Sequence, residues 1–192
     1  MTLSITDGWL TEALHIQSPN CDQRPEQSAV DAVVIHGISL PPGQYGGDWI
    51  NALFTNTLDA AVHPYFAELK DLRVSAHVLI ARDGTLTQYV SFDERAWHAG
   101  KSCLDGRDGC NDFSIGIELE GCDDDAYEDI QYQRLASLLT ALRRHYPAID
   151  QQRIVGHADI APGRKTDPGP AFDWPKLRRL LDEQRMTGNS AA

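Results

Sequence analysis

Residues 113–120 read FSIGIELE, and apolar and polar side chains alternate along most of this stretch. A period of two is typical of a β-strand, because successive side chains point to opposite faces of a sheet. One predicted face carries the large apolar side chains Phe113, Ile115, Ile117 and Leu119. The other carries two small residues and two acids, Ser114, Gly116, Glu118 and Glu120. We therefore expect a strand with one face in the core and open space above part of the other.

Other β-prone runs lie before and after this stretch. Residues 32–35 (AVVI) end at His36, and residues 153–156 (RIVG) lead directly into His157. Short apolar runs of this kind are typical of buried strands. A hairpin is predicted from residue 75 to residue 90, because its centre, Asp83-Gly84, tolerates the positive φ angles of a tight turn.

Two longer segments have helical periodicity. In residues 127–145, leucines recur at the spacing of one helix face. Asp125 and Glu128 stand three residues apart before this run, as in a capping box. A last helix is expected to start near Asp173, and a short helix is expected over residues 48–54.

The uneven alternation of strands and helices, together with the hairpin, indicates an α/β fold. We expect a single domain with a mixed central β-sheet flanked by helices. The chain has 192 residues, of which 42% are hydrophobic, enough for one domain with a substantial core. The domain is expected to span residues 1–185. Residues 186–192 have no periodic pattern and are expected to form a disordered tail.

The charge of the chain excludes two classes of partner. There are 17 basic and 28 acidic residues, giving a formal net charge of −11. This balance argues against nucleic acid and against a membrane surface, because both attract basic proteins. No export signal, no stretch of ~20 apolar residues and no CxxC pair is present. We therefore expect a cytoplasmic protein with free thiols and no obligate protein partner.

Two of the seven histidines, His36 and His157, stand directly after the predicted strands. Ligand sites of open sheets tend to lie at the carboxyl ends of strands. Residues 161–170 (APGRKTDPGP) form a constrained loop, in which Pro168 favours an extended backbone at Asp167. Two histidines and one carboxylate can hold a catalytic zinc ion, with the fourth position left for water or substrate. The alternative is that Asp167 is an ordinary turn residue before proline.

Two further residues suit hydrolysis at such a site. Glu118 can take a proton from an attacking water and pass it to a leaving amine. Lys165, two residues before Asp167, can stabilise a developing oxyanion. The alternatives are a solvent-facing acid and an ordinary loop lysine. The HExxH, PCxxC, GxGxxG and P-loop patterns are missing, which argues against other common zinc and nucleotide sites.

Five segments of the chain closely resemble the AmpD family, the cytosolic 1,6-anhydro-N-acetylmuramyl-L-alanine amidases of bacterial cell-wall recycling. They are residues 33–47 (VVIHGISLPPGQYGG), 63–80 (HPYFAELKDLRVSAHVLI), 95–100 (RAWHAG), 111–121 (NDFSIGIELEG) and 156–174 (GHADIAPGRKTDPGPAFDW). The resemblance covers nearly the whole chain. It implies a mixed sheet flanked by helices, as in peptidoglycan-recognition proteins and phage amidases.

The resemblance also implies a site. A zinc cofactor would be held by His36, His157 and Asp167. Glu118 would act as the general base and acid, and Lys165 would stabilise the tetrahedral intermediate. The residue patterns point to the same five positions by a separate argument.

Substrate contacts follow from the resemblance alone. The residues that match positions along the substrate cleft are Tyr65, Arg73, Trp97 and His98. The alternative for each of them is ordinary packing in the core or on the surface. His77 is expected to support the site structurally. The chain departs from the family at Gly37, where asparagine is common, and at Gly109, where arginine is common. We expect Arg107 to replace that arginine in binding an acidic stem peptide.

We therefore predict a zinc-dependent amidase that acts on a small glycopeptide. It would hydrolyse the amide between (1,6-anhydro-)N-acetylmuramic acid and L-alanine in muropeptides. The alternative is a non-catalytic peptidoglycan-binding module of the same fold. A third hypothesis is an amidase that acts on intact cell wall outside the cytoplasm, against which the lack of an export signal argues.

Overall fold

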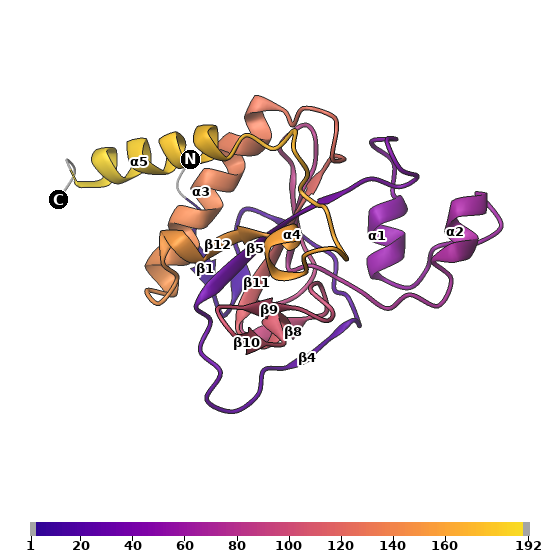
Figure 1. Ribbon diagram of the computed structural model, residues 1–192, viewed down its shortest axis with the longest axis horizontal. Helices are drawn as coiled ribbons and strands as arrows, with labels where there is room; N and C mark the ends of the chain where they lie inside the picture. The colour runs from indigo at the N-terminus through magenta and orange to yellow at the C-terminus, as the bar shows by residue number, and fades with distance from the viewer. Residues whose placement is uncertain (1–2, 190–192) are drawn as a thin grey trace.

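The computed structural model describes residues 3–189 of the chain (Figure 1). Its centre is a six-stranded sheet with the strand order β12-β5-β11-β6-β7-β3. These strands are β3 (Leu14–His15), β5 (Ala32–Ile38), β6 (Val78–Ile80), β7 (Leu86–Gln88), β11 (Ser114–Glu120) and β12 (Ile154–Gly156). The pairs from β12 to β6 are parallel, β6 and β7 are antiparallel, and β3 is parallel to β7. The sheet is therefore mixed, and β6 and β7 form the predicted hairpin.

The strand β11 lies between β5 and β6, and all of its residues are buried. Ile115, Ile117 and Leu119 belong to the main hydrophobic core. Two long helices, α3 (Asp129–His145) and α5 (Trp174–Asn189), contribute to the same core. Figure 1 shows α3 and α5 next to each other on the left of the view. The apolar face of β11 is therefore covered by helices, as its alternating pattern predicted.

The opposite face of the sheet is covered by shorter elements. The helices α1 (Trp49–Phe54) and α2 (Pro64–Glu68) pack against β6 through a second apolar cluster that includes Phe54, Phe66 and Leu79. Figure 1 shows α1 and α2 on the right, away from α5. The acidic residues of β11 are thus buried under protein. The site is built on this face.

The prediction that Phe113 shares a face with the isoleucines of β11 was wrong. Phe113 lies before the strand, at the end of the 3-10 helix η1 (Cys110–Asp112), where its ψ angle of 4° bends the chain. Its ring consequently packs with Val34 and Ile160 in a third apolar cluster.

The predicted capping box of α3 was placed three residues too early. The helix begins at Asp129, and the side chain of Gln131 accepts a hydrogen bond from the Glu128 backbone at 2.9 Å. Asp125 lies too far from the first turn to cap it. Its carboxylate instead accepts a hydrogen bond from the Tyr45 hydroxyl at 2.6 Å.

Several short elements complete the fold. They are β1 (Ile5–Thr6), β2 (Trp9–Leu10), β4 (Cys21–Gln23), β8 (Glu94–Ala96), β9 (Cys103–Leu104), β10 (Arg107–Asp108), α4 (His157–Ile160) and η2 (Gln151–Arg153). Helix α5 continues to Asn189, so the predicted tail begins with helix, and its last residues, 190–192, lie outside the described residues. The four cysteines are free thiols, as expected. Among residues 3–189, no helix is long and apolar enough to cross a membrane.

Candidate metal centre and active site

Parallel strand pairing brings the two strand-end histidines together. β12 pairs with β5 so that Gly156 lies opposite Ile35, and a histidine follows each of these residues. His36 and His157 therefore both lie at the carboxyl edge of the sheet. In the next strand, Glu118 lies opposite His36 in register. Residues in register project from the same face, so Glu118 stands on the same side of the sheet as His36.

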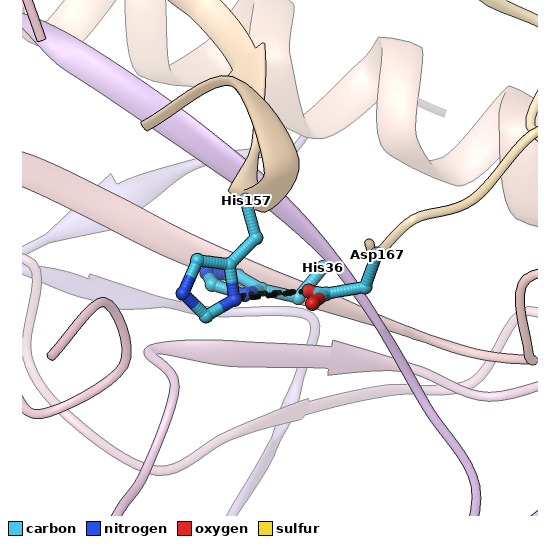
Figure 2. Close-up of side chains that lie close together, drawn as sticks. All are labelled: His36, His157 and Asp167. Carbon is cyan, nitrogen blue, oxygen red and sulfur yellow. Dashed lines mark hydrogen bonds and ion pairs between the residues drawn. The ribbon is translucent and has the colours of Figure 1, made fainter. Parts of the chain in front are cut away.

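Three side-chain atoms meet at this edge (Figure 2). The Nδ1 atoms of His36 and His157 are 2.9 Å apart, and each lies 3.1 Å from Oδ2 of Asp167. Figure 2 shows the two rings and the carboxylate converging from three separate segments. These segments are β5, the start of α4 and the loop after α4.

The donor set fits a zinc ion. His36, His157 and Asp167 each offer one ligand atom, and these atoms all lie within 4.8 Å of one another. Two imidazoles and a carboxylate are the ligands of many catalytic zinc sites, with bonds of about 2.0–2.2 Å. Tetrahedral ligands at that distance lie roughly 3.3 Å apart, close to the sides of the observed triangle. The two imidazole nitrogens come from different elements, so the tertiary fold preforms the triangle.

Two hydrogen bonds to backbone carbonyls fix the loop that carries Asp167. Its backbone carbonyl accepts a hydrogen bond from the Ala158 N–H at 3.0 Å. The next carbonyl, that of Pro168, accepts a hydrogen bond from the buried Tyr127 hydroxyl at 2.9 Å. Gly37 leaves the space that this hydroxyl occupies, because a Cβ atom there would lie 2.2 Å from it. Tyr127 was not identified from the sequence, where it shows only as the start of a helix.

The electrostatics of the site favour the protonation states that a metal needs. Burial lowers the pKa of His36 to about 4, so the ring is neutral at neutral pH. Neutral imidazoles and an ionised carboxylate are the forms that coordinate metal.

Glu118 is poised beside the three candidate ligands. It is 9% exposed, and its Oε2 atom is buried without a hydrogen-bond partner among the described residues. Burial raises the pKa of Glu118 well above its usual value, and the charge of Asp167 adds to this effect. Lys165 is exposed, and its positive charge acts on Glu118 in the opposite direction. A carboxyl group whose pKa lies closer to neutrality is suited to both accepting and donating a proton.

The structure gives the other predicted substrate residues contacts of their own. The Arg73 guanidinium donates hydrogen bonds to the carbonyls of Lys70 and Leu72. Trp97 donates one to Asp22, and Arg107 lies over the Phe113 ring and 3.4 Å from Asp31. Tyr65 is half-buried in α2. None of these four has a described contact with the three candidate ligands, so their part in substrate binding stays a prediction.

His98 differs from that group, because it touches the metal centre directly. Its Nδ1 atom lies 3.0 Å from Nε2 of His36, and the ring is 9% exposed. The ring occupies the space above Gly116 that the sequence left open: a Cβ atom at Gly116 would lie 2.4 Å from it. The glycine in the middle of the strand was the only sequence feature that pointed to this contact.

Comparison with known proteins agrees with the geometry. The profile of the family described as N-acetylmuramoyl-L-alanine amidase matches residues 26–170. The 1,6-anhydro-N-acetylmuramyl-L-alanine amidase AmpD of Salmonella typhimurium is 59% identical over 174 residues, covering 91% of this chain and 92% of the relative.

Solved structures give the same result. A crystal structure of a selenomethionine AmpD derivative superposes with a TM-score of 0.90 at 58% identity, covering 92% of this chain and 98% of that one. Escherichia coli AmiD, solved with the substrate anhydro-N-acetylmuramic acid-L-Ala-D-γ-Glu-L-Lys, has a TM-score of 0.57 at 30% identity, covering 93% of this chain and 65% of that one. The chain therefore belongs to the N-acetylmuramoyl-L-alanine amidase family.

Proposed function

We propose that this amidase uses zinc to cleave muropeptides in the cytoplasm. The bond is the amide between the lactyl group of 1,6-anhydro-N-acetylmuramic acid and L-alanine. The observation that carries the proposal is the triangle of His36, His157 and Asp167 at the carboxyl edge of the sheet. The name of the Salmonella relative supports the choice of bond. The glycopeptide in the AmiD structure supports the chemical class of substrate.

The three candidate ligands and Glu118 have distinct roles in the proposed reaction. A bound zinc ion supplies Lewis acidity and makes water acidic enough to give hydroxide near neutral pH. The ion would be held by the three residues of the triangle, with a position left for water or substrate. Glu118 accepts the proton of the attacking water, and its buried Oε2 atom has no hydrogen-bond partner among residues 3–189 that would compete for this role.

The same carboxyl group then delivers that proton to the alanine nitrogen as the carbon–nitrogen bond breaks. One water molecule is consumed, and the products are the lactyl carboxylate and a peptide with a free amino terminus. Lys165 places a positive charge near the oxygen that becomes negative in the transition state. Its electrostatic effect on both Glu118 and His36 supports this position.

We assign substrate recognition to four exposed or half-buried residues, Tyr65, Arg73, Trp97 and Arg107. The two arginines would attract the carboxylates of the stem peptide. The net charge of −11 opposes the approach of an acidic ligand, so local basic residues must provide the attraction.

Two measurements test the proposal. Protein purified without chelator should contain one equivalent of zinc per chain, and content well below this contradicts the metal assignment. Incubation with anhydro and non-anhydro muropeptides, followed by mass spectrometry, should release free peptide from the anhydro substrate. Binding without release would instead indicate a peptidoglycan-binding module.

A further inference from the structure

We infer that His98 is a positioning residue that holds His36 in the tautomer needed for metal binding, and that the backbone carbonyl of Ala99 does the same for His157. The inference rests on the proposed zinc site. His98 and the Ala99 carbonyl contact the Nε2 atoms of His36 and His157, on the side of each ring away from the triangle.

The direction of each hydrogen bond follows from a fixed acceptor. The Cys110 carbonyl can only accept, and it accepts the hydroxyl proton of Ser114 at 2.6 Å. The Ser114 oxygen therefore has no proton left for His98 and must accept from Nε2 of that ring, which lies 3.3 Å away. A neutral imidazole carries one proton, so Nδ1 of His98 is an acceptor. His36 accordingly donates its Nε2 proton to His98.

This series of hydrogen bonds leaves a lone pair of His36 where a metal would bind. With its proton on Nε2, a neutral His36 has a bare Nδ1, and that atom is a corner of the triangle. The opposite tautomer would let Nδ1 donate to Oδ2 of Asp167, 3.1 Å away, but it would place a proton inside the triangle and leave two acceptors facing each other between His36 and His98. The hydrogen-bond chain from Cys110 thus favours the metal-binding tautomer.

The tautomer of the second histidine, His157, is favoured by Ala99, the residue that follows His98. Nε2 of His157 lies 3.3 Å from the carbonyl oxygen of Ala99, which can only accept, so a proton on this nitrogen makes a hydrogen bond and leaves Nδ1 bare. A proton on Nδ1 would instead be donated to Oδ2 of Asp167, 3.1 Å away, and would leave the Nε2 lone pair facing the Ala99 oxygen. The Arg164 guanidinium donates to the same carbonyl at 2.7 Å. The hydrogen bond to Ala99 therefore favours a lone pair on Nδ1 of His157 that faces the triangle.

The pair His98-Ala99 is itself held in place. The side-chain oxygen of Asn111 accepts hydrogen bonds from both backbone N–H groups, at 3.1 Å from His98 and 2.7 Å from Ala99. The His98 ring rests on the backbone of Gly116, where a Cβ atom would displace it. One dipeptide thus supports both histidine ligands from a fixed position.

Two substitutions separate hydrogen bonding from packing. His98→Phe keeps an aromatic ring, somewhat larger than imidazole, but removes the acceptor, whereas His98→Asn loses volume but keeps an oxygen that can take the place of Nδ1. Partners behind metal ligands typically contribute 10–100-fold to metal affinity. We expect zinc affinity, measured by competition with a chromophoric chelator, to fall about 10–100-fold in His98→Phe. His98→Asn should recover much of this loss.

A spectroscopic measurement tests the tautomers without zinc. Long-range ¹H–¹⁵N correlation spectra of the metal-free protein distinguish protonated from bare ring nitrogens. Wild type should show His36 and His157 protonated mainly at Nε2, although Oδ2 of Asp167 lies 3.1 Å from each Nδ1 as a competing acceptor. In His98→Phe, the proton of His36 should be redistributed toward Nδ1, while His157 stays unchanged as the internal control.

The inference is overturned if His36 keeps its proton on Nε2 in His98→Phe, or if that variant binds zinc better than His98→Asn. Circular dichroism verifies folding, and if His98→Phe does not fold, Ser114→Ala decides. That variant removes the acceptor of the His98 proton and should shift the His36 tautomer in the same direction. An unshifted spectrum would contradict the series of hydrogen bonds from Cys110 to His36. If wild type binds no zinc, the proposed function fails, while the metal-free spectra still test the tautomers.

Discussion

Replacing Gly37 by alanine should destabilise the protein through one atom, the hydroxyl oxygen of Tyr127. Gly37 follows the metal-ligand candidate His36 in β5. An added Cβ atom would lie 2.2 Å from the hydroxyl oxygen, and the next nearest atoms would lie at 3.5 Å or beyond. The hydroxyl must therefore move by more than 1 Å to reach an ordinary contact distance of 3.4 Å.

The size of the effect follows from the bond that this movement breaks. The hydroxyl donates to the buried Pro168 carbonyl at 2.9 Å. A buried carbonyl that loses its partner costs about 1–3 kcal/mol. Replacing glycine by alanine regains about 0.4–1 kcal/mol, because the unfolded chain loses conformational freedom. Gly37→Ala should therefore lower the free energy of unfolding by about 1–2 kcal/mol.

The double variant gives the sharper test. In Tyr127→Phe the hydroxyl is absent, and the ring carbon Cζ would lie 3.5 Å from the new Cβ, an ordinary contact. Gly37→Ala should then be neutral or stabilise by up to about 1 kcal/mol. The coupling free energy between the two sites, from urea unfolding of the four metal-free proteins, should be about 1–3 kcal/mol. An equal effect of Gly37→Ala in both backgrounds would refute the reasoning.

Three further predictions concern the site. Glu118→Gln should bind zinc like wild type but hydrolyse muropeptide about 10²–10⁴-fold more slowly in a product assay, and retained activity would remove Glu118 from the mechanism. Because the folded protein raises the pKa of Glu118, it binds that proton more tightly than the unfolded chain does. The contribution of Glu118 to the unfolding free energy of the metal-free protein should thus fall as pH rises from about 4, whereas the lowered pKa of His36 contributes in the opposite direction. The unfolding free energy of metal-free wild type should therefore fall relative to that of metal-free Glu118→Gln over this range, and parallel pH profiles in urea would contradict it. Asp167→Ala should lose stoichiometric zinc after dialysis, with far-UV circular dichroism as the folding control, and full zinc content would exclude Asp167 as a ligand.

Local patterns in the sequence predicted much of the fold. The alternation in residues 113–120 predicts β11, the Asp83-Gly84 turn predicts the hairpin, and leucine spacing predicts α3. These features depend on neighbours within a few positions, so the chain itself displays them. The predictions failed where a boundary mattered: Phe113 lies outside the strand, and Asp125 lies before the cap of the helix. The two-residue strands and the helix α2 are too short for periodicity to reveal.

The sequence by itself also placed His36 and His157 at strand ends and identified Asp167 and Glu118 as partners in chemistry. Only the tertiary structure decided that three of these side chains meet within 2.9–3.1 Å, because that depends on the parallel register of β12 and β5 and on the placement of the loop that carries Asp167. Only the structure showed that His98 lies behind His36 and that Tyr127 holds the loop of Asp167. These contacts join residues more than forty positions apart in the chain. Local periodicity says which face a side chain takes, whereas register and loop placement determine which side chain it meets there.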